Sequence, residues 1–147
     1  MLHLETVTPD NWRLDLKVRE DQLAFVSDLP HILARAYAYR DCRSQVYIIY
    51  KDTMPIGMAL YYDVDALQNY NLSQFFIDRH YQGQGYGEAA TRLLLQKMKE
   101  DGKYDKVALC YVEGDTAGRK LYGKIGFKPT GEFDEDEIVM EMSLTSI

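Results

Sequence analysis

The stretch Gln82-Gly83-Gln84-Gly85-Tyr86-Gly87 is the most informative part of this 147-residue chain. It stands between an apolar, β-rich run at 71–78 and a segment at 85–100 whose apolar residues recur at helical spacing. Glycine permits positive φ and a close approach of the backbone to a ligand, and the first turn of a helix offers free N–H groups. The stretch therefore indicates either a loop that binds phosphate or diphosphate, or a plain glycine-rich turn.

Two familiar nucleotide-binding loops do not fit this stretch. A dinucleotide-binding fingerprint needs Gly-x-Gly-x-x-Gly, whereas the glycines here are spaced Gly-x-Gly-x-Gly and follow runs that predict hairpins. A Walker A loop needs Gly-Lys-Ser/Thr, whereas Gly87 precedes Glu88.

The N-terminal residues predict one strand followed by helices. Residues 2–8 alternate apolar and polar side chains, and Thr8-Pro9-Asp10 is typical of a helix start. The apolar residues from Trp12 to Val26 then predict one or two helices. Ser27-Asp28 begins a further helix that runs to about Tyr39.

The remaining segments complete one sheet. Residues 45–51 and 56–63 predict a hairpin that precedes the central strand at 71–78. After the glycine stretch we expect a helix at 85–100, a strand at 106–112, a helix at 115–125 that Gly126 ends, and strands at 127–133 and 137–144. The order β-α-α-β-β-β-α-β-α-β-β predicts a single α/β (α+β) domain over residues 1–147 with one mixed sheet.

A second motif lies on the helix predicted at 115–125. Asp115, Gly118 and Tyr122 are spaced i, i+3 and i+7, so they share one face of that helix. Because Gly118 has no side chain, it leaves room for a ligand beside this face. Tyr122 either presents its hydroxyl to a ligand in that room or packs in the core.

The two motifs together resemble those of the GNAT superfamily of acetyl-CoA-dependent N-acetyltransferases. Gln82, Gly85 and Gly87 fill the family pattern Gln/Arg-x-x-Gly-x-Gly/Ala. The segment 115–127 follows the pattern Asn-x-x-Ala-x-x-Leu-Tyr-x-x-x-Gly-Phe, except that Asp115 and Gly118 replace Asn and Ala. The predicted element order is also the family's order. The resemblance implies a largely antiparallel sheet whose fourth and fifth strands splay.

The resemblance also implies where acetyl-CoA lies. The loop would hold the diphosphate, the central strand would pair its backbone with the pantetheine arm, and Asp115 would face the pantetheine amide. Glu88 would repel a diphosphate, so we expect its side chain to point away. The acetyl-CoA-binding residues expected on this basis are Phe76, Ile77, Gln82, Gly83, Gln84, Gly85, Tyr86, Gly87, Asp115, Gly118 and Lys124.

The implied reaction needs a base, an oxyanion donor and an acid. A lysine-like amine has a pKa of about 10.4, so its proton must be removed before it attacks. Tyr122 is the expected acid for the leaving thiolate, and a backbone N–H near Ile77 the expected donor to the thioester oxygen. Glu113 is the candidate base. The alternatives are that Glu113 is a solvated strand-end carboxylate and that water carries the proton to a more distant carboxylate.

Shorter similarities, such as residues 75–83, point toward bacterial spermine/spermidine acetyltransferases and so toward a polyamine acceptor. Tyr61, Tyr62 and Asp63 could bind its ammonium groups through aromatic faces and charge. One alternative is acetylation of an amino acid, a peptide N-terminus or an aminoglycoside. An alternative from another class is a non-catalytic acyl-CoA-binding regulatory module.

Composition narrows the class of protein further. The net charge is −6, and residues 128–147 contribute six carboxylates against Lys128 alone. This balance argues against nucleic-acid binding, and the acidic segment could draw in a cationic amine or simply keep a turn soluble. Cys42, Cys110 and three scattered histidines show no zinc-ligand spacing, so we expect no metal. We also expect a cytoplasmic protein with no membrane partner and, by family analogy, a possible homodimer.

Overall fold

The computed structural model describes residues 1–25 and 27–147, so that Val26 lies outside the described residues. Seven strands of the described chain form one sheet in the spatial order β1-β2-β3-β4-β5-β7-β6. The strands are β1 (Leu2–Thr6), β2 (Gln45–Lys51), β3 (Met54–Val64), β4 (Asn69–Ile77), β5 (Lys106–Val112), β6 (Lys128–Asp134) and β7 (Glu137–Ser143). The helices are α1 (Leu29–Ala38), α2 (Tyr86–Asp101) and α3 (Thr116–Ile125), with short 3-10 turns η1 (Glu20–Gln22), η2 (Arg40–Cys42), η3 (Asp65–Leu67) and η4 (Leu144–Ser146).

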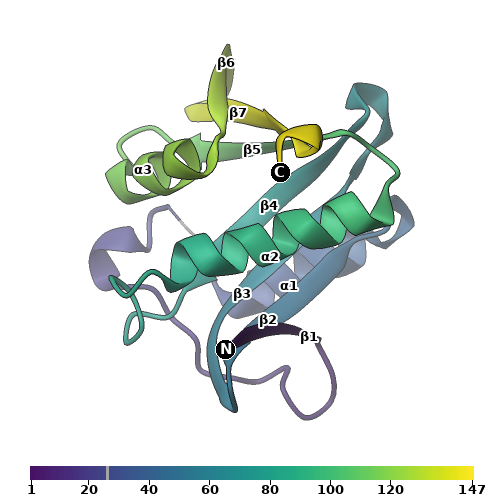
Figure 1. Cartoon of the computed structure of the whole chain (residues 1–147). Helices are drawn as coiled ribbons and strands as arrows, with labels where there is room; N and C mark the ends of the chain where they lie inside the picture. Colours follow the sequence, from purple (N-terminus) through teal and green to yellow (C-terminus); the bar gives the residue numbers. More distant parts are fainter. Residues whose placement is uncertain (26) are drawn as a thin grey trace.

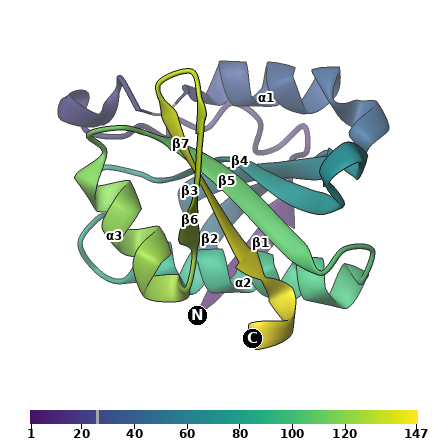
Figure 2. The same ribbon diagram turned by 90° about the horizontal axis from the view of Figure 1, so that it is seen from above.

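The sheet separates two layers of helices, with α1 on one face and α2 and α3 on the other (Figure 2). Leu94 and Met98 of α2 and Ile125 of α3 are buried in the core on one face. Ile32 of α1 packs against Ile48 of β2 on the other face. Because alternate side chains of a strand point to opposite faces, the central strands are apolar on both. Each such side chain contributes about 1.5–3 kcal/mol when it is fully buried.

The predicted mixed sheet with splayed strands is confirmed. β4 and β5 run parallel, and every other neighbouring pair of strands is antiparallel. In the described chain, β4 pairs with β5 only from Tyr70 to Leu72, against Val107 to Leu109. Since β4 continues to Ile77 and β5 to Val112, the two strands separate beyond this short ladder, and Figure 1 shows them diverging.

One predicted element is wrong within the described residues. Where one or two α-helices were expected between Pro9 and Phe25, the chain forms a turn, an extended stretch and the single 3-10 turn η1. The buried Asn11 holds the turn, because its side chain accepts the Thr8 N–H (2.7 Å) and donates to the Thr6 carbonyl (3.0 Å). We call residues 14–25 the strap.

Helix α1 begins where the sequence predicts it. The Asp28 carboxylate accepts the His31 N–H at 3.0 Å, and Pro30 lies in the first turn. Such an N-cap satisfies one of the free donors of the first turn. Within the described chain no helix is both long and apolar enough to cross a membrane.

Candidate active site

A cavity of about 380 Å³ lies beside the separating end of β4. Four parts of the chain surround it: the strap, the end of β4, residues 82–87, which we call the glycine loop, and the first turns of α3. Its lining residues are Val18, Arg19, Gln22, Phe25, Phe75, Phe76, Ile77, Tyr81, Gln82, Gly83, Gly87, Asp115, Ala117, Gly118, Leu121 and Tyr122. The cavity thus brings together the two motifs that the sequence singled out.

The last residues of β4 present their backbone to this cavity. The Asp78 N–H donates to the Ile56 carbonyl at 2.7 Å, so this group points toward β3. By strand alternation, the N–H and carbonyl of Ile77 point the other way, toward the open side. The Ile77 carbonyl accepts from Gln82 Nε2 at 2.8 Å, and the Ile77 N–H has the orientation that the expected oxyanion donor needs.

The backbone of Phe76 departs from the expectation that it pairs with the pantetheine arm. A Cβ added to Gly57 would lie 2.3 Å from the Phe76 carbonyl oxygen, which shows that this carbonyl faces β3. The Phe76 side chain lines the cavity instead. Neighbouring residues of a strand point their backbone groups in opposite directions, so only one of Phe76 and Ile77 can present its N–H and carbonyl to the cavity. The sequence pattern does not show which of the two it is.

The glycine loop fits a diphosphate. Gly83 and Gly85 have φ of 76° and 84°, and a Cβ at either would meet nothing within 4 Å. Gly85 is the N-cap of α2 without a side-chain cap, so the first N–H groups of the helix stay open to a ligand. Gln84, Gly85 and Tyr86 lie outside the lining, with Gln84 and Gly85 exposed.

Asp115 and Gly118 form one structural unit. The Asp115 carboxylate is the N-cap of α3 and accepts the Gly118 N–H at 3.0 Å through Oδ1. A Cβ at position 118 would lie 2.6 Å from Asp115 Oδ2. The two departures from the family pattern therefore lie in contact, and a Cβ at position 118 would require the Asp115 carboxylate to shift.

Tyr122 lines the same cavity one turn further along α3. It is half-buried, and its ring meets Phe127 edge-on with centroids 5.8 Å apart. Burial raises the pKa of Tyr122, and the nearby charge of Asp115 raises it further. The hydroxyl therefore keeps its proton at neutral pH, as a general acid must.

Other expected site residues lie outside the cavity lining. Glu113 is exposed, and its backbone N–H donates to the Asp136 carbonyl at 3.3 Å. Lys124 pairs with Glu88 at 3.0 Å, and the second oxygen of Glu88 lies 3.5 Å from Arg92 Nε. These two cations offset the Glu88 charge, which was expected to repel a diphosphate.

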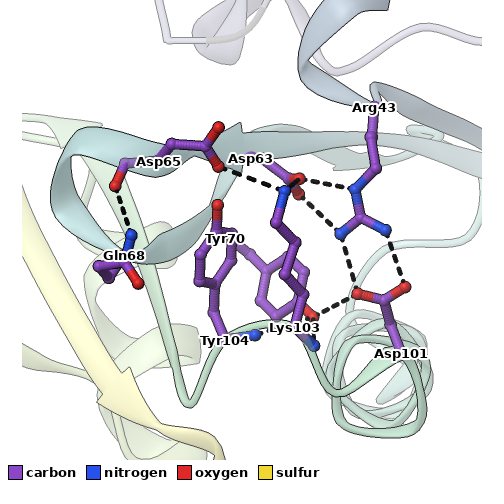
Figure 3. Close-up of polar contacts among 8 residues, drawn as sticks. All are labelled: Arg43, Asp63, Asp65, Gln68, Tyr70, Asp101, Lys103 and Tyr104. Carbon is purple, nitrogen blue, oxygen red and sulfur yellow. Dashed lines mark hydrogen bonds and ion pairs between the residues drawn. The ribbon is translucent and has the colours of Figure 1, made fainter.

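Of the expected substrate group, Tyr61 and Asp63 line one cavity of about 340 Å³, whereas Tyr62 lies on the opposite face of the sheet. Tyr61 packs in the core beneath α2, whereas Tyr62 packs on the α1 face. Asp63 is buried and already paired with Arg43 (2.6 Å) and Lys103 (2.9 Å), as Figure 3 shows. Burial raises the pKa of Asp63, but these hydrogen bonds and charges outweigh it and lower the pKa overall. Arg43 also pairs with Asp101 at 2.9 Å, so the network joins the C-terminal ends of β3 and α2.

The strap residues of the cavity were missed in the sequence. The sequence predicts that Arg19, Gln22 and Phe25 lie in a helix, and it gives them no role in the site. The alternation of Leu14, Leu16 and Val18 with charged residues was the available signal, since a period of two is typical of extended chain.

Comparison with known proteins identifies the family of the chain. Residues 10–127 match the acetyltransferase (GNAT) family. The spermine/spermidine N(1)-acetyltransferase of Bacillus subtilis (strain 168) is 32% identical over 146 residues, covering 90% of this chain and 91% of that protein. The probable spermine N(1)-acetyltransferase of Bacillus subtilis subsp. natto shows the same identity and coverage.

Solved structures share the fold. An aminoglycoside acetyltransferase in complex with coenzyme A has a TM-score of 0.80 at 15% identity, covering 97% of this chain and 95% of its own. The spermidine N-acetyltransferase from Vibrio cholerae in complex with CoA and spermine has a TM-score of 0.78 at 14% identity, covering 98% and 96%. The family match and the curated relatives show that the chain belongs to the GNAT family and is an acetyl-CoA-dependent N-acetyltransferase.

Proposed function

We propose that this enzyme transfers the acetyl group of acetyl-CoA to a primary amino group of a polyamine such as spermidine or spermine. The observation that carries the proposal is the meeting of Tyr122, the Ile77 backbone and the glycine loop around one cavity. The two curated relatives, which are named for spermine or for spermine and spermidine, support the choice of acceptor.

The lining groups fit direct attack of the amine within a ternary complex. Acetyl-CoA supplies the activated acetyl group. The Ile77 N–H donates to the thioester oxygen as charge develops there, and the protonated Tyr122 gives its proton to the departing sulfur. The amine loses its own proton through water, with Glu113 as our candidate for the carboxylate that finally accepts it.

The β6–β7 hairpin supports a cationic acceptor. The Cys110 sulfur and one carboxylate oxygen each of Asp134 and Glu137 lie within 4.8 Å of one another. Burial raises the pKa of Glu137, and the charges of Asp134 and Asp136 raise it further. An ammonium group placed between these carboxylates would offset their repulsion. Because they lie outside the cavity lining, they suit a distant ammonium of a long acceptor rather than the attacking amine.

A panel of amines tests this proposal. We would measure thiol release from acetyl-CoA with spermine, spermidine, a diamine, lysine, glycine and an aminoglycoside. One additional charged contact contributes about 1.4 kcal/mol, so kcat/KM should rise about tenfold from glycine, which has a single amino group, to the polyamines. Glu137→Gln should remove most of this gain and leave the rate with glycine unchanged.

Two results would contradict the proposal. Equal kcat/KM for spermidine, lysine and glycine would reject the polyamine as acceptor. Calorimetric binding of acetyl-CoA without thiol release on any amine would instead favour the regulatory module.

A further inference from the structure

The strap is fastened to the end of β4 by a buried carboxylate. Asp78 is 3% exposed, and its Oδ2 accepts the Lys17 N–H at 2.9 Å. The Arg79 N–H donates back to the Lys17 carbonyl at 2.7 Å. The other oxygen of Asp78 accepts the His80 N–H at 3.0 Å. Buried polar groups with all their partners in place hold a segment in one position.

Gln22 then joins the strap to the glycine loop. Its Oε1 accepts both the Arg19 N–H (3.4 Å) and Nε2 of Gln82 (2.9 Å). Arg19 and Gln22 consequently line the cavity together with Gln82 and Gly83. Figure 2 shows the strap turn η1 and helix α3 on the same side of the molecule. The strap thus places the side chains of Arg19 and Gln22 beside the glycine loop, where we expect the diphosphate.

Arg19 is the one cationic side chain among the lining residues of the described chain. Its side chain is 57% exposed, and its ion-pair partner is Asp21, with Nε and Oδ1 3.4 Å apart. Exposed pairs of this kind contribute little, so the guanidinium can exchange this partner for a phosphate. Lys124, the cation expected from the sequence, is engaged by Glu88.

We propose that Arg19 binds the diphosphate of acetyl-CoA and adds a side-chain cation to the backbone N–H groups of the glycine loop. A guanidinium can donate two parallel hydrogen bonds to phosphate oxygens, which matches this ligand. It also offsets the negative charge that Asp115 places in the same cavity. This inference rests on acetyl-CoA being the donor and is independent of which amine is acetylated.

Calorimetric titration of the full chain with two donors tests it. Acetyl-CoA carries the diphosphate, whereas S-acetyl-pantetheine lacks it. Arg19→Gln should raise the Kd of acetyl-CoA about five- to tenfold, as expected for one charge-assisted contact, and leave the Kd of S-acetyl-pantetheine unchanged. Arg19→Lys, which keeps the charge but not the paired donors, should fall between. Asp21→Asn should tighten acetyl-CoA binding, because it frees the guanidinium and removes a negative charge.

Arg13→Gln is the matched control, because Arg13 is an exposed arginine near the start of the strap that stacks over Trp12 outside the cavity. It should leave both constants unchanged. An unchanged Kd for acetyl-CoA in Arg19→Gln overturns the inference. An equal increase in the Kd of both donors also overturns it, because Arg19 would then only shape the cavity and not bind the diphosphate. If the unaltered chain binds neither donor, the proposed function fails instead.

Discussion

Gly57→Ala is the sharpest test of how β3 positions the reacting end of β4. The added Cβ would lie 2.3 Å from the Phe76 carbonyl oxygen and 3.2 Å from the Ile77 Cα. Ordinary contact begins at 3.4 Å, so the first distance is about 1 Å too short. The opposing atom belongs to the backbone and cannot rotate away. β4 must therefore move away from β3 at the residue that carries the expected oxyanion donor.

The size of the effect follows from this displacement. Overpacking costs about 1–3 kcal/mol, and we expect the upper end because backbone must move. For a chain of this length, about 3 kcal/mol lowers Tm by about 6–12 °C. A shift of about 1 Å in a reacting group can reduce kcat by about a hundredfold. Both losses come from one contact.

Thermal unfolding followed by circular dichroism, and thiol release at saturating substrates, measure the two losses. Gly123→Ala is the matched control, since a Cβ there meets nothing within 4 Å inside α3 and should stabilise the helix by about 0.5–1 kcal/mol. If Gly57→Ala melts at the temperature of the unaltered protein and keeps its kcat, the close approach of β3 to β4 does not exist in solution.

Three further outcomes are expected. Tyr122→Phe should lower kcat about a hundredfold or more with little change in the calorimetric Kd of acetyl-CoA; an unaffected single-turnover rate would remove Tyr122 as the acid. Asp28→Ala should cost about 1 kcal/mol in urea unfolding through loss of the α1 cap, and an unmoved midpoint would contradict that role. Hydrogen bonds from Arg43 and Tyr70 lower the pKa of Asp101 from 3.8 to about 2, so its stabilisation is complete above the ordinary value and is lost as pH falls from 3.8 toward 2. Asp101→Asn should flatten that part of the pH–stability curve, and parallel curves would refute the linkage.

Elements with local signals could be predicted from the sequence. β2 matches its predicted residues 45–51, because a continuous run of β-branched and aromatic residues is bounded by polar ones. Helix α1 was found through its capping Asp28. The alternation at residues 14–18 is a local signal of extended chain, but the position of the strap against β4 has none. The hydrogen bond that Asp78 accepts from Lys17 joins residues 61 apart, and a local pattern carries no information at that separation.

The site divides in the same way. Gly83, Gly85 and Tyr122 stand in motifs whose spacing reflects local backbone requirements, and the structure gathers them beside one cavity or at its edge. Asp63 looked available because its partners Arg43 and Lys103 lie 20 and 40 residues away in the chain. A carboxylate's neighbours in space, which decide whether it can take a ligand, follow from the fold alone.

The short ladder between β4 and β5 has a consequence for handling the protein. Beyond Leu72 and Leu109, β4 and β5 no longer pair with each other in the described chain. The facing edges of the two strands are therefore open, although both strands lie in the middle of the sheet. Unpaired edges invite pairing with other chains, which is a common route to aggregation. A donor whose pantetheine arm occupies this gap would act as a removable capping strand. We therefore expect the protein to stay dispersed longer during concentration and storage when coenzyme A is present, as light scattering over time would record.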